Sequence, residues 1–437
     1  MTKIQYLLIL IIISGCSLNQ NSKFWTKSEK INEDKDFVVK LKTEEIFKKN
    51  DVIVQEFNKD IKIKFDKNST IEKKSLKYSN NFGRINFDGN LKKSSRFKYS
   101  KIDNFYEYEP ELIFHNENVI FFDNNGTILN FTKDSKLKWR KNFYTRSEKK
   151  LNPILQFAKN EKYLIVADNI AKYFMLDIET GELIWSKYNP APFNSQIKIF
   201  KDRFFIIDST NTLRCISVKN GKEIWNLKTQ NSLIRSQKKL SLVIVKNIIY
   251  FNNSVGDISA VDLQNGELLW QLPTQDSLIY ESAFSLETSE LISDGGNLYF
   301  SNNKNQFFSI DLNVGNFDWE TTINSNLRPT IFGNIIFTIS IEGFLFLIDK
   351  NNGNIIRTTD LFDNLKSNKR AITKPTGFIL GKDKIYLSTN VGILFVIDAI
   401  TGKTLKKLKI DNEKILRPIN LNNYLFVVKD NAIIKLN

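Results

Sequence analysis

The chain has 437 residues and a formal net charge of +15, and its lysines are spread along the whole length and mixed with acidic residues. Because the positive charge does not gather in one segment, the sequence does not indicate a nucleic-acid partner. One histidine and two cysteines are too few for the usual zinc clusters, and no Gly-rich phosphate loop, Gly-x-Ser-x-Gly elbow or dinucleotide fingerprint is present. The sequence therefore predicts no catalytic residue, metal site or cofactor.

Residues 1–15 have the pattern of a bacterial lipoprotein signal peptide. Lys3 precedes a mostly apolar stretch at 4–13, and Cys16 follows it after Ser-Gly. The apolar stretch is too short to span a bilayer as a helix. Its end resembles a lipobox, which implies cleavage before Cys16 and lipid attachment to that residue. Ser17, where an aspartate would imply retention in the inner membrane, favours a lipid anchor on the periplasmic face of the outer membrane of a Gram-negative bacterium.

The next two segments differ from the rest of the chain. Residues 16–50 are rich in Lys, Asn, Asp, Glu and Ser, a composition that cannot bury enough surface to fold alone, and they predict a flexible tether. Residues 51–95 form an N-terminal extension, in which DVIVQEF (51–57) and IKIKFD (61–66) predict a possible hairpin.

From residue 96 to residue 437, one cassette recurs: two apolar strands, a Gly-containing turn, and a strand that carries Trp. The tryptophans at the repeated position are Trp139, Trp185, Trp225, Trp270 and Trp319. The turn glycines are Gly181, Gly221, Gly266, Gly315, Gly353 and Gly402. Successive glycines are about 40 to 50 residues apart, which is the size of one four-stranded propeller blade.

The apolar runs of the cassette are strands rather than helices. Runs such as YLIVAD (163–168) and RFFIIDS (203–209) are short or alternate at period two, whereas helical repeats would show a period of 3.6. Eight strand-pair units predict an all-β, eight-bladed β-propeller of four-stranded antiparallel blades, with seven blades as the alternative. The last unit, 424–437, lacks a Gly-Trp strand, and RFKYSKI (96–102) is the segment expected to complete it.

The repeated polar and aromatic positions predict structural roles. An indole at one position per blade can wedge between adjacent sheets. Arg357 and Lys406 take this position in the two copies that lack Trp. An aspartate four residues before the glycine is expected to cap the turn; these residues are Asp177, Asp262, Asp311, Asp349 and Asp398.

The Asp-x-x-x-Gly-x-x-x-Trp cassette resembles the pyrroloquinoline-quinone-type repeat. Together with the lipobox, it makes the chain resemble the BamB family, the lipoprotein propeller subunit of the outer-membrane β-barrel assembly machinery. The resemblance implies a non-enzymatic scaffold, a monomer within a complex, that binds the BamA-type insertase and other assembly subunits through loops on one propeller face. It carries the contact role onto Leu233, Ile234 and Arg235 in loop 228–238 and onto Glu287 in loop 282–290.

Two other classes stay open. Quinoprotein dehydrogenases share the repeat and hold a quinone with calcium at the ring axis, but they resemble larger chains with a vicinal disulfide. With Cys16 lipidated, Cys215 is the remaining cysteine, so this chain cannot form such a disulfide. A propeller lipoprotein that binds another envelope protein or a glycan would also fit the repeat and the lipobox.

Overall fold

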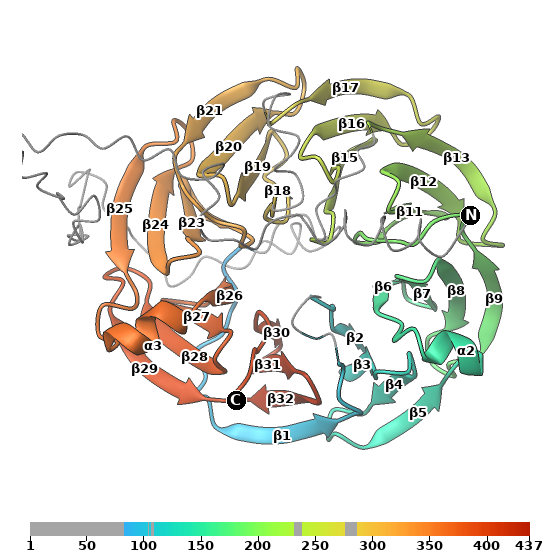
Figure 1. The fold of residues 1–437 in the computed structure, drawn as a ribbon, viewed down its shortest axis with the longest axis horizontal. Coiled ribbons are helices and arrows are strands. Elements are labelled where there is room, and N and C mark those ends of the chain that lie inside the picture. The colour runs from blue at the N-terminus through green and yellow to red at the C-terminus, as the bar shows by residue number, and fades with distance from the viewer. Residues whose placement is uncertain (1–82, 104, 106–108, 231–237, 276–285) are drawn as a thin grey trace, which may run out of the picture. The chain divides into compact units, whose positions relative to one another are not determined.

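The computed structural model describes residues 83–437 except 104, 106–108, 231–237 and 276–285. These residues form eight four-stranded antiparallel sheets arranged in a ring (Figure 1). The prediction of an eight-bladed propeller is confirmed, and the seven-bladed alternative is wrong. Neither α2 (Arg146–Lys149) nor α3 (Ser367–Ile372), the helices in this part of the chain, has the length and apolar character needed to cross a bilayer.

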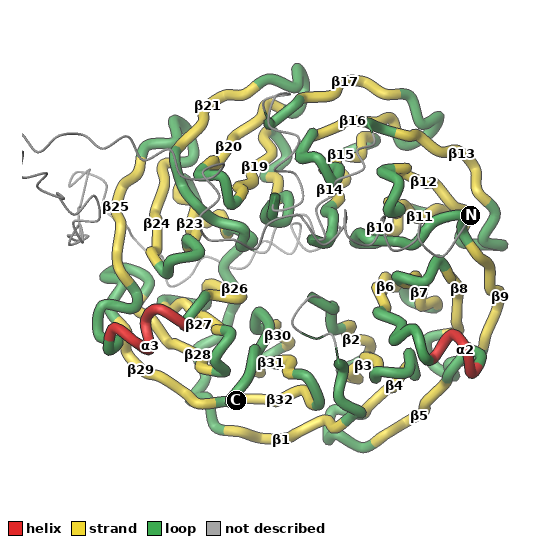
Figure 2. The backbone as a smooth tube through the Cα atoms, viewed as in Figure 1, coloured by secondary structure: helices red, strands yellow, loops and turns green. Residues whose placement is uncertain are grey.

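In blades 1 to 7 the four strands follow one another from the inside of the ring to the rim (Figure 2). Blade 1 contains β2 (Ile113–His115), β3 (Asn118–Phe122), β4 (Ile128–Phe131) and β5 (Leu137–Lys141). Blade 2 contains β6 (Leu155–Lys159), β7 (Tyr163–Asp168), β8 (Lys172–Asp177) and β9 (Leu183–Tyr188). Blade 3 contains β10 (Lys198–Phe200), β11 (Arg203–Ile207), β12 (Thr212–Ser217) and β13 (Glu223–Lys228). Blade 4 contains β14 (Leu242–Val245), β15 (Ile248–Asn252), β16 (Ile258–Asp262) and β17 (Leu268–Leu272).

The second half of the ring repeats this arrangement. Blade 5 contains β18 (Ile292–Ser293), β19 (Asn297–Asn302), β20 (Gln306–Asp311) and β21 (Phe317–Thr321). Blade 6 contains β22 (Thr330–Phe332), β23 (Ile335–Ile339), β24 (Phe344–Asp349) and β25 (Ile355–Asp360). Blade 7 contains β26 (Pro375–Leu380), β27 (Lys384–Thr389), β28 (Ile393–Asp398) and β29 (Thr404–Lys409).

Blade 8 closes the ring with strands from the two ends of the described chain. It contains β30 (Ile419–Leu421), β31 (Tyr424–Lys429) and β32 (Ala432–Leu436), with β1 (Lys93–Lys98) as the rim strand (Figure 1). Phe97 of β1 pairs with Ile433 of β32. The predicted closing segment, 96–102, overlaps β1 but begins three residues later. In the other blades a turn of the chain joins the third strand to the rim strand. In blade 8 backbone hydrogen bonds take its place, from the N–H of Leu91 to the carbonyl of Asn437 and from the N–H of Asn437 to the carbonyl of Lys92.

The burial of each strand follows its place in the blade. Middle strands such as β7 and β11 are buried at nearly every position, because neighbouring blades cover both faces of each sheet. The rim strands alternate, so that β9 and β13 have partly buried residues between exposed ones. This explains why the middle strands read as continuous apolar runs and the rim strands as mixed ones.

The indole of each Trp-containing blade lies on the glycine turn of the following blade. At Gly315, whose φ is +72°, an added Cβ would lie 2.4 Å from Cδ2 of Trp270. The same relation joins Trp139 to Gly181, Trp185 to Gly221, Trp225 to Gly266, and Trp319 to Gly353. Two indoles also donate to the next turn, Trp185 to the carbonyl of Val218 at 2.9 Å and Trp319 to that of Lys350 at 3.0 Å.

At the seam between blades 6 and 7, Arg357 supplies a hydrogen-bond donor in place of the indole, but no aromatic ring covers the glycine turn. The guanidinium of Arg357 donates to the carbonyl of Ile400 in the following turn, as the indole N–H groups of Trp185 and Trp319 do at their seams. Gly402 is covered by Thr359 rather than by an aromatic ring. The cassette therefore tolerates loss of Trp where a cation supplies the hydrogen bond.

The predicted capping by the repeated aspartates is confirmed. Asp177 accepts from the backbone N–H of Glu179 at 3.0 Å and of Thr180 at 2.9 Å. Asp262, Asp311, Asp349 and Asp398 accept from the backbone two residues further along their own turns. These carboxylates satisfy donors of the turn between the third and fourth strands.

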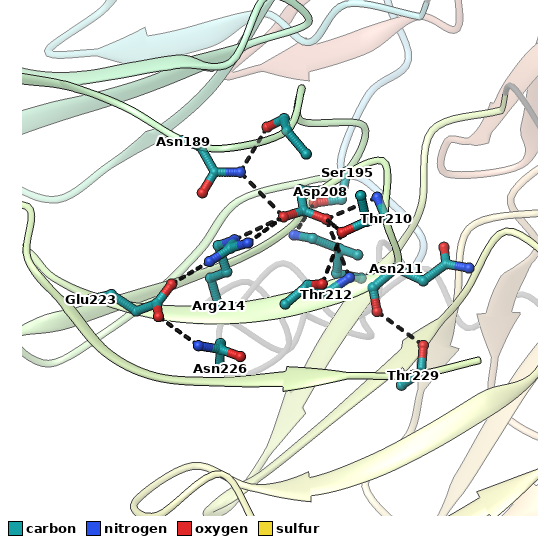
Figure 3. Close-up of polar contacts among 12 residues, drawn as sticks. Asn189, Ser195, Asp208, Thr210, Asn211, Thr212, Arg214, Glu223, Asn226 and Thr229 are labelled. Carbon is teal, nitrogen blue, oxygen red and sulfur yellow. Dashed lines mark hydrogen bonds and ion pairs between the residues drawn. The ribbon is translucent and has the colours of Figure 1, made fainter. Parts of the chain in front are cut away.

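A second set of caps lies in the turns between the second and third strands, and the sequence reading missed it. Asp208, which is fully buried, accepts from the backbone of Thr210 at 2.9 Å and of Thr212 at 3.3 Å. Its other oxygen accepts from Arg214 at 2.8 Å and Asn189 at 3.2 Å (Figure 3). The same arrangement recurs in three other blades. There the side chain accepts from the backbone N–H groups two and four residues further along the chain, and the accepting residues are Asp123, Asp168 and Asn253.

The first turn of α2 contains a half-buried carboxylate that makes stability depend on pH. Glu148 accepts from the N–H of Thr145 at 2.6 Å, from Tyr188 at 2.7 Å and from Lys172 at 3.2 Å. Burial opposes its ionisation, but these hydrogen bonds outweigh burial and lower the pKa of Glu148 to about 2. A carboxyl with a depressed folded-state pKa stabilises the fold above its unfolded pKa, and that contribution is lost as pH falls.

We therefore expect wild type to lose about 1 kcal/mol more stability than Glu148→Gln between pH 5 and pH 2, because solvent screens part of these interactions. Urea unfolding of both proteins across this range measures the difference. The exposed Glu161 supplies the control, because Glu161→Gln should leave the pH profile of wild type unchanged. Parallel profiles for wild type and Glu148→Gln would contradict the prediction.

Candidate functional site

The segments that join one blade to the next all emerge on one face of the ring. The four strands of each blade run antiparallel. The end of a rim strand, the start of the inner strand of the next blade, and the turn between the second and third strands of each blade therefore all lie on the same face of the ring. We call this the connection face. It is formed by the described residues of the segments 99–112, 142–154, 189–197, 229–241, 273–291, 322–329, 361–374 and 410–418. Both loops that were predicted to bind a partner, 228–238 and 282–290, are among these connections.

The structure describes part of the predicted partner site. Leu233, Ile234 and Arg235 lie outside the described residues, as does the predicted lipidation site Cys16. Glu287 is exposed on the connection between blades 4 and 5. Its backbone is held by Asn303, which accepts from the Glu287 N–H at 2.9 Å through its side chain and donates to the Glu287 carbonyl at 3.0 Å.

Asn326 joins the described ends of the two loops. Its side-chain amide donates to the carboxylate of Glu287. Its carbonyl accepts from Nζ of Lys238, 2.7 Å away, and Lys238 is the first described residue after 231–237. Lys238 and Glu287, one residue from each loop predicted to contact a partner, therefore lie beside the same residue on the connection face.

A cluster of charged side chains lies beside these loops. We call it the axial cluster, and it consists of Glu109, Glu111, Lys198, Lys238, Lys239, Glu290, Arg328, Lys414 and Arg417. Its position follows from Gln196, which precedes blade 3 and donates to Glu290 before blade 5 at 2.9 Å and to Glu111 before blade 1 at 3.3 Å. Blades 1, 3 and 5 are not neighbours, so side chains from all three can meet only near the axis of the ring.

Ion pairs organise the cluster. Lys239 lies 2.8 Å from Glu111, and Arg328 lies 3.0 Å from Glu290. Lys238 reaches the carboxylate of Glu109 at 3.9 Å. The remaining cations interact electrostatically with the same carboxylates: Lys198 with Glu111 and Glu290, Arg417 with Glu290, and Lys414 with Glu109. Among the described residues of the cluster, six cations therefore face three carboxylates.

Burial and like charge shift the protonation of this cluster. Burial opposes ionisation of Glu290, but Arg328 and Arg417 outweigh it and hold the pKa of this carboxyl well below its usual range. Burial lowers the pKa of Lys198 to about 8, and the positive charge of Arg328 contributes to that shift. The pKa of Arg328 is lowered to about 9, by burial first and also by the charge of Arg417. The cluster thus carries ionised carboxylates and crowded cations.

Sequence reasoning missed the axial cluster. Its members stand just before or at the start of the short inner strands, where a charge interrupts an otherwise apolar stretch. The tripeptide Leu-Arg-Pro occurs twice there, at 327–329 and 416–418, and supplies Arg328 and Arg417. That repetition outside the Gly-Trp cassette was the signal that could have indicated them.

Cys215 and His115 lie in different blades and share no site. Cys215 is buried in β12, and burial raises the pKa of its thiol to about 12. His115, at the end of β2, lies 2.8 Å from the carboxylate of Glu179. Across the described part of the chain, His, Cys, Asp and Glu side chains form no group of three that could hold a metal ion.

Comparison with known proteins identifies the family of the chain. A sequence model described as "Outer membrane protein assembly factor BamB" matches residues 124–359, more than half of the chain. No curated protein matches significantly. The structure of BamB from Moraxella catarrhalis is similar with a TM-score of 0.64 and 14% identity, over 79% of this chain and 99% of that one.

Two solved structures of other proteins have the same fold. Quinohemoprotein alcohol dehydrogenase ADHIIG from Pseudomonas putida HK5 has a TM-score of 0.58 and 11% identity, over 82% of this chain and 78% of that one. Sqt1 from Saccharomyces cerevisiae has a TM-score of 0.58 and 12% identity, over 82% of this chain and 99% of that one. At such identities these likenesses show the shared propeller fold and not a shared function.

Proposed function

This chain belongs to the BamB family of outer membrane protein assembly factors, and we propose that it is a non-enzymatic scaffold of the outer-membrane β-barrel assembly machinery. In this proposal, a lipid on Cys16 holds the propeller on the periplasmic side of the outer membrane. The connection face then binds a BamA-type insertase through Leu233, Ile234, Arg235 and Glu287.

The observation that carries the proposal is the bridge made by Asn326. It ties Glu287 to Lys238, three residues beyond Arg235, so one partner surface could contact both loops at once. Arginine is enriched at binding hot spots, and the exposed Glu287 lies near Lys238, at the described end of the loop that contains Arg235. A ring of eight packed sheets holds Lys238 and Glu287 in fixed places, which lowers the entropy that binding at these two residues costs.

The axial residues do not favour the dehydrogenase alternative. A quinone with calcium would need oxygen ligands that are available to a divalent cation. Here Glu111 and Glu290 are engaged by Lys239 and Arg328, and the described cations of the axial cluster outnumber its carboxylates. The charge of this cluster opposes a calcium ion, and we assign no reaction to it.

Copurification from detergent-solubilised membranes tests the scaffold role. We expect the full-length, lipidated chain to recover a BamA-type insertase. Leu233→Asp combined with Arg235→Glu should reduce that recovery by about tenfold or more, because truncation of a hot spot costs about 2 kcal/mol or more. Glu287→Lys should reduce it as well.

The matched control places the same changes on the opposite face. Val314 is 63% exposed and Lys219 is exposed, and both lie in turns between third and fourth strands. Val314→Asp combined with Lys219→Glu should leave recovery at the wild-type level. Equal recovery by both double variants would refute the contact assignment, and a purified protein with bound quinone and alcohol-oxidising activity would refute the scaffold role.

A further inference from the structure

We propose that the rim of blades 7, 8 and 1 is a membrane-contact surface that binds the anionic headgroups of the bilayer in which the lipid anchor lies. This surface, which we call the basic rim, consists of the exposed cations of β29, β1 and β5, the rim strands of three consecutive blades (Figure 1). The inference rests on the proposed function, because it takes the bilayer to be the one that a lipid on Cys16 would enter. It adds a second contact with that bilayer, made by the propeller itself.

Three cations of the basic rim occupy equivalent positions, and we call them the cation row. Lys407, Arg96 and Arg140 each come one residue after the position that is Trp in blades 1 to 5, as the strand registers show. All three side chains are exposed. In blades 2 to 6 the same position holds uncharged or acidic residues, namely Ser186, Asn226, Gln271, Glu320 and Thr358. The cation row is therefore confined to three consecutive blades. Because β1 and β29 are more than 300 residues apart in the chain, the ring gathers charges that the sequence spreads.

None of the three rim strands carries a carboxylate. β29, β1 and β5 are described in full and contain no Asp or Glu. The exposed Lys98 and Lys409 lie at one further equivalent position, whereas Lys138 is left out because Glu179 lies 2.6 Å from it. Residues 17–82 contain more lysines than acidic residues, so their net charge has the same sign as that of the basic rim.

Protection of sheet edges does not account for the basic rim. Lysine on an edge strand hinders pairing with the edges of other molecules. A rim strand is an edge in every blade, yet β17 has no charged residue and β21 carries Asp318 and Glu320. A charge that distinguishes three consecutive blades from the others indicates a surface with a preferred orientation.

An exposed leucine among the cations favours a lipid surface over a nucleic acid. Leu405 of β29 is 55% exposed and lies between Lys403 and Lys406 in the chain, both of which are exposed. At a bilayer surface an apolar side chain enters the boundary of the acyl chains while neighbouring lysines stay with the headgroups. A nucleic-acid backbone offers the leucine no such environment.

Contact through the rim is compatible with the proposed partner contact. The connection face is a face of the ring, whereas β29, β1 and β5 lie on its outer border (Figure 2). A propeller that rests on this border would stand upright on the membrane and leave the connection face open to the side. An extended chain gains about 3.3 Å per residue, so residues 17–82 are long enough to let the lipid reach the bilayer in this orientation.

The test places the lipidated full-length protein on preformed vesicles and measures, by mass spectrometry, how fast a water-soluble amine reagent labels each lysine. On vesicles of equal parts phosphatidylglycerol and phosphatidylcholine, Lys98 and Lys409 should be labelled about tenfold more slowly than on phosphatidylcholine alone, because each cation near an anionic surface adds to the attraction. High salt should remove the difference, since ions screen exposed charges. The exposed Lys219 and Lys222, in the turn between β12 and β13, should be labelled equally on both kinds of vesicle.

Charge removal identifies the cations responsible. The variant without the cation row is Lys407→Gln, Arg96→Gln, Arg140→Gln. It should be labelled at Lys98 and Lys409 as fast as wild type is on phosphatidylcholine. Arg96→Lys combined with Arg140→Lys should keep the protection, because attraction to headgroups depends on charge rather than on a fixed geometry. The matched control, which removes the same charge from blade 3 and should also keep the protection, is Lys219→Gln, Lys222→Gln, Lys228→Gln.

Protection that persists without the cation row would overturn the inference, and so would equal labelling of wild type on both kinds of vesicle. If the triple variant unfolds early, Lys407→Gln alone repeats the test with β1 and β5 intact, and it should lose part of the protection. Slower labelling with a DNA duplex but not with phosphatidylglycerol would mean a nucleic-acid surface and would overturn the membrane assignment. Recovery of the insertase is a separate result, because the triple variant leaves the connection face unchanged. Its failure in wild type would refute the scaffold role and leave the membrane contact standing.

Discussion

Gly315→Ala is expected to lower the free energy of unfolding by about 3 kcal/mol, which is large for the addition of one methyl group. Two costs combine at this position. The backbone has a φ of +72°, where an L-side chain crowds the neighbouring carbonyl, and the new Cβ would lie 2.4 Å from the indole of Trp270. Because that indole fills the seam between blades 4 and 5, it cannot withdraw without opening a void. Urea unfolding monitored by tryptophan fluorescence measures the effect.

A comparison of variants separates the two costs. Gly333 has a φ of +60° and no heavy atom within 4 Å of an added Cβ, so Gly333→Ala should show the backbone cost alone, about 1 kcal/mol. Trp270→Ala should cost about 3 kcal/mol by itself. In that background, Gly315→Ala should cost no more than Gly333→Ala. Strict additivity of Gly315→Ala and Trp270→Ala would show that the indole does not lie on this turn.

The sequence was sufficient to predict the ring because the same local solution recurs in each blade. A glycine turn, an aspartate cap and an indole recur about every 40 to 50 residues at the contacts between neighbouring blades. The number of blades can therefore be predicted from their spacing. The direction of the contact was not predictable. Nothing in the spacing of Trp270 and Gly315 says that the indole covers the next turn rather than the turn of its own blade.

The candidate site was harder to predict, because its residues are not repeated. Glu111, Gln196 and Glu290 stand far apart in the sequence, in the connections before three different blades, and they meet because the inner strands converge on one axis. A linear pattern carries no information about which blades face one another across a ring. The buried cap Asp208 was missed for a related reason, since Asp, Asn, Ser and Thr alternate at its position in other blades.

Ring closure leads to the second large effect. Phe97→Ala should lower the free energy of unfolding by about 4 kcal/mol, because Phe97 is fully buried in β1 and contacts the rings of Phe131 in blade 1 and Phe426 in blade 8. Its loss weakens both the seam to blade 1 and the pairing of β1 with β32. We expect fast amide exchange in 432–436, measured by mass spectrometry, before the rest of the ring exchanges.

Phe251→Ala provides the matched control for this local effect. Phe251 is equally buried, but it lies in β15, whose neighbours in blade 4 are joined to it by short turns. Its loss should destabilise the protein by a similar amount, about 4 kcal/mol, without selective exchange in 432–436. The two variants differ because β1 is held to β32 across more than 300 residues of chain, so β1 can separate while each remaining blade stays folded. Equal exchange at 432–436 in both variants would mean that the ring opens only as a whole and that blade 8 is no weaker than the covalently continuous blades.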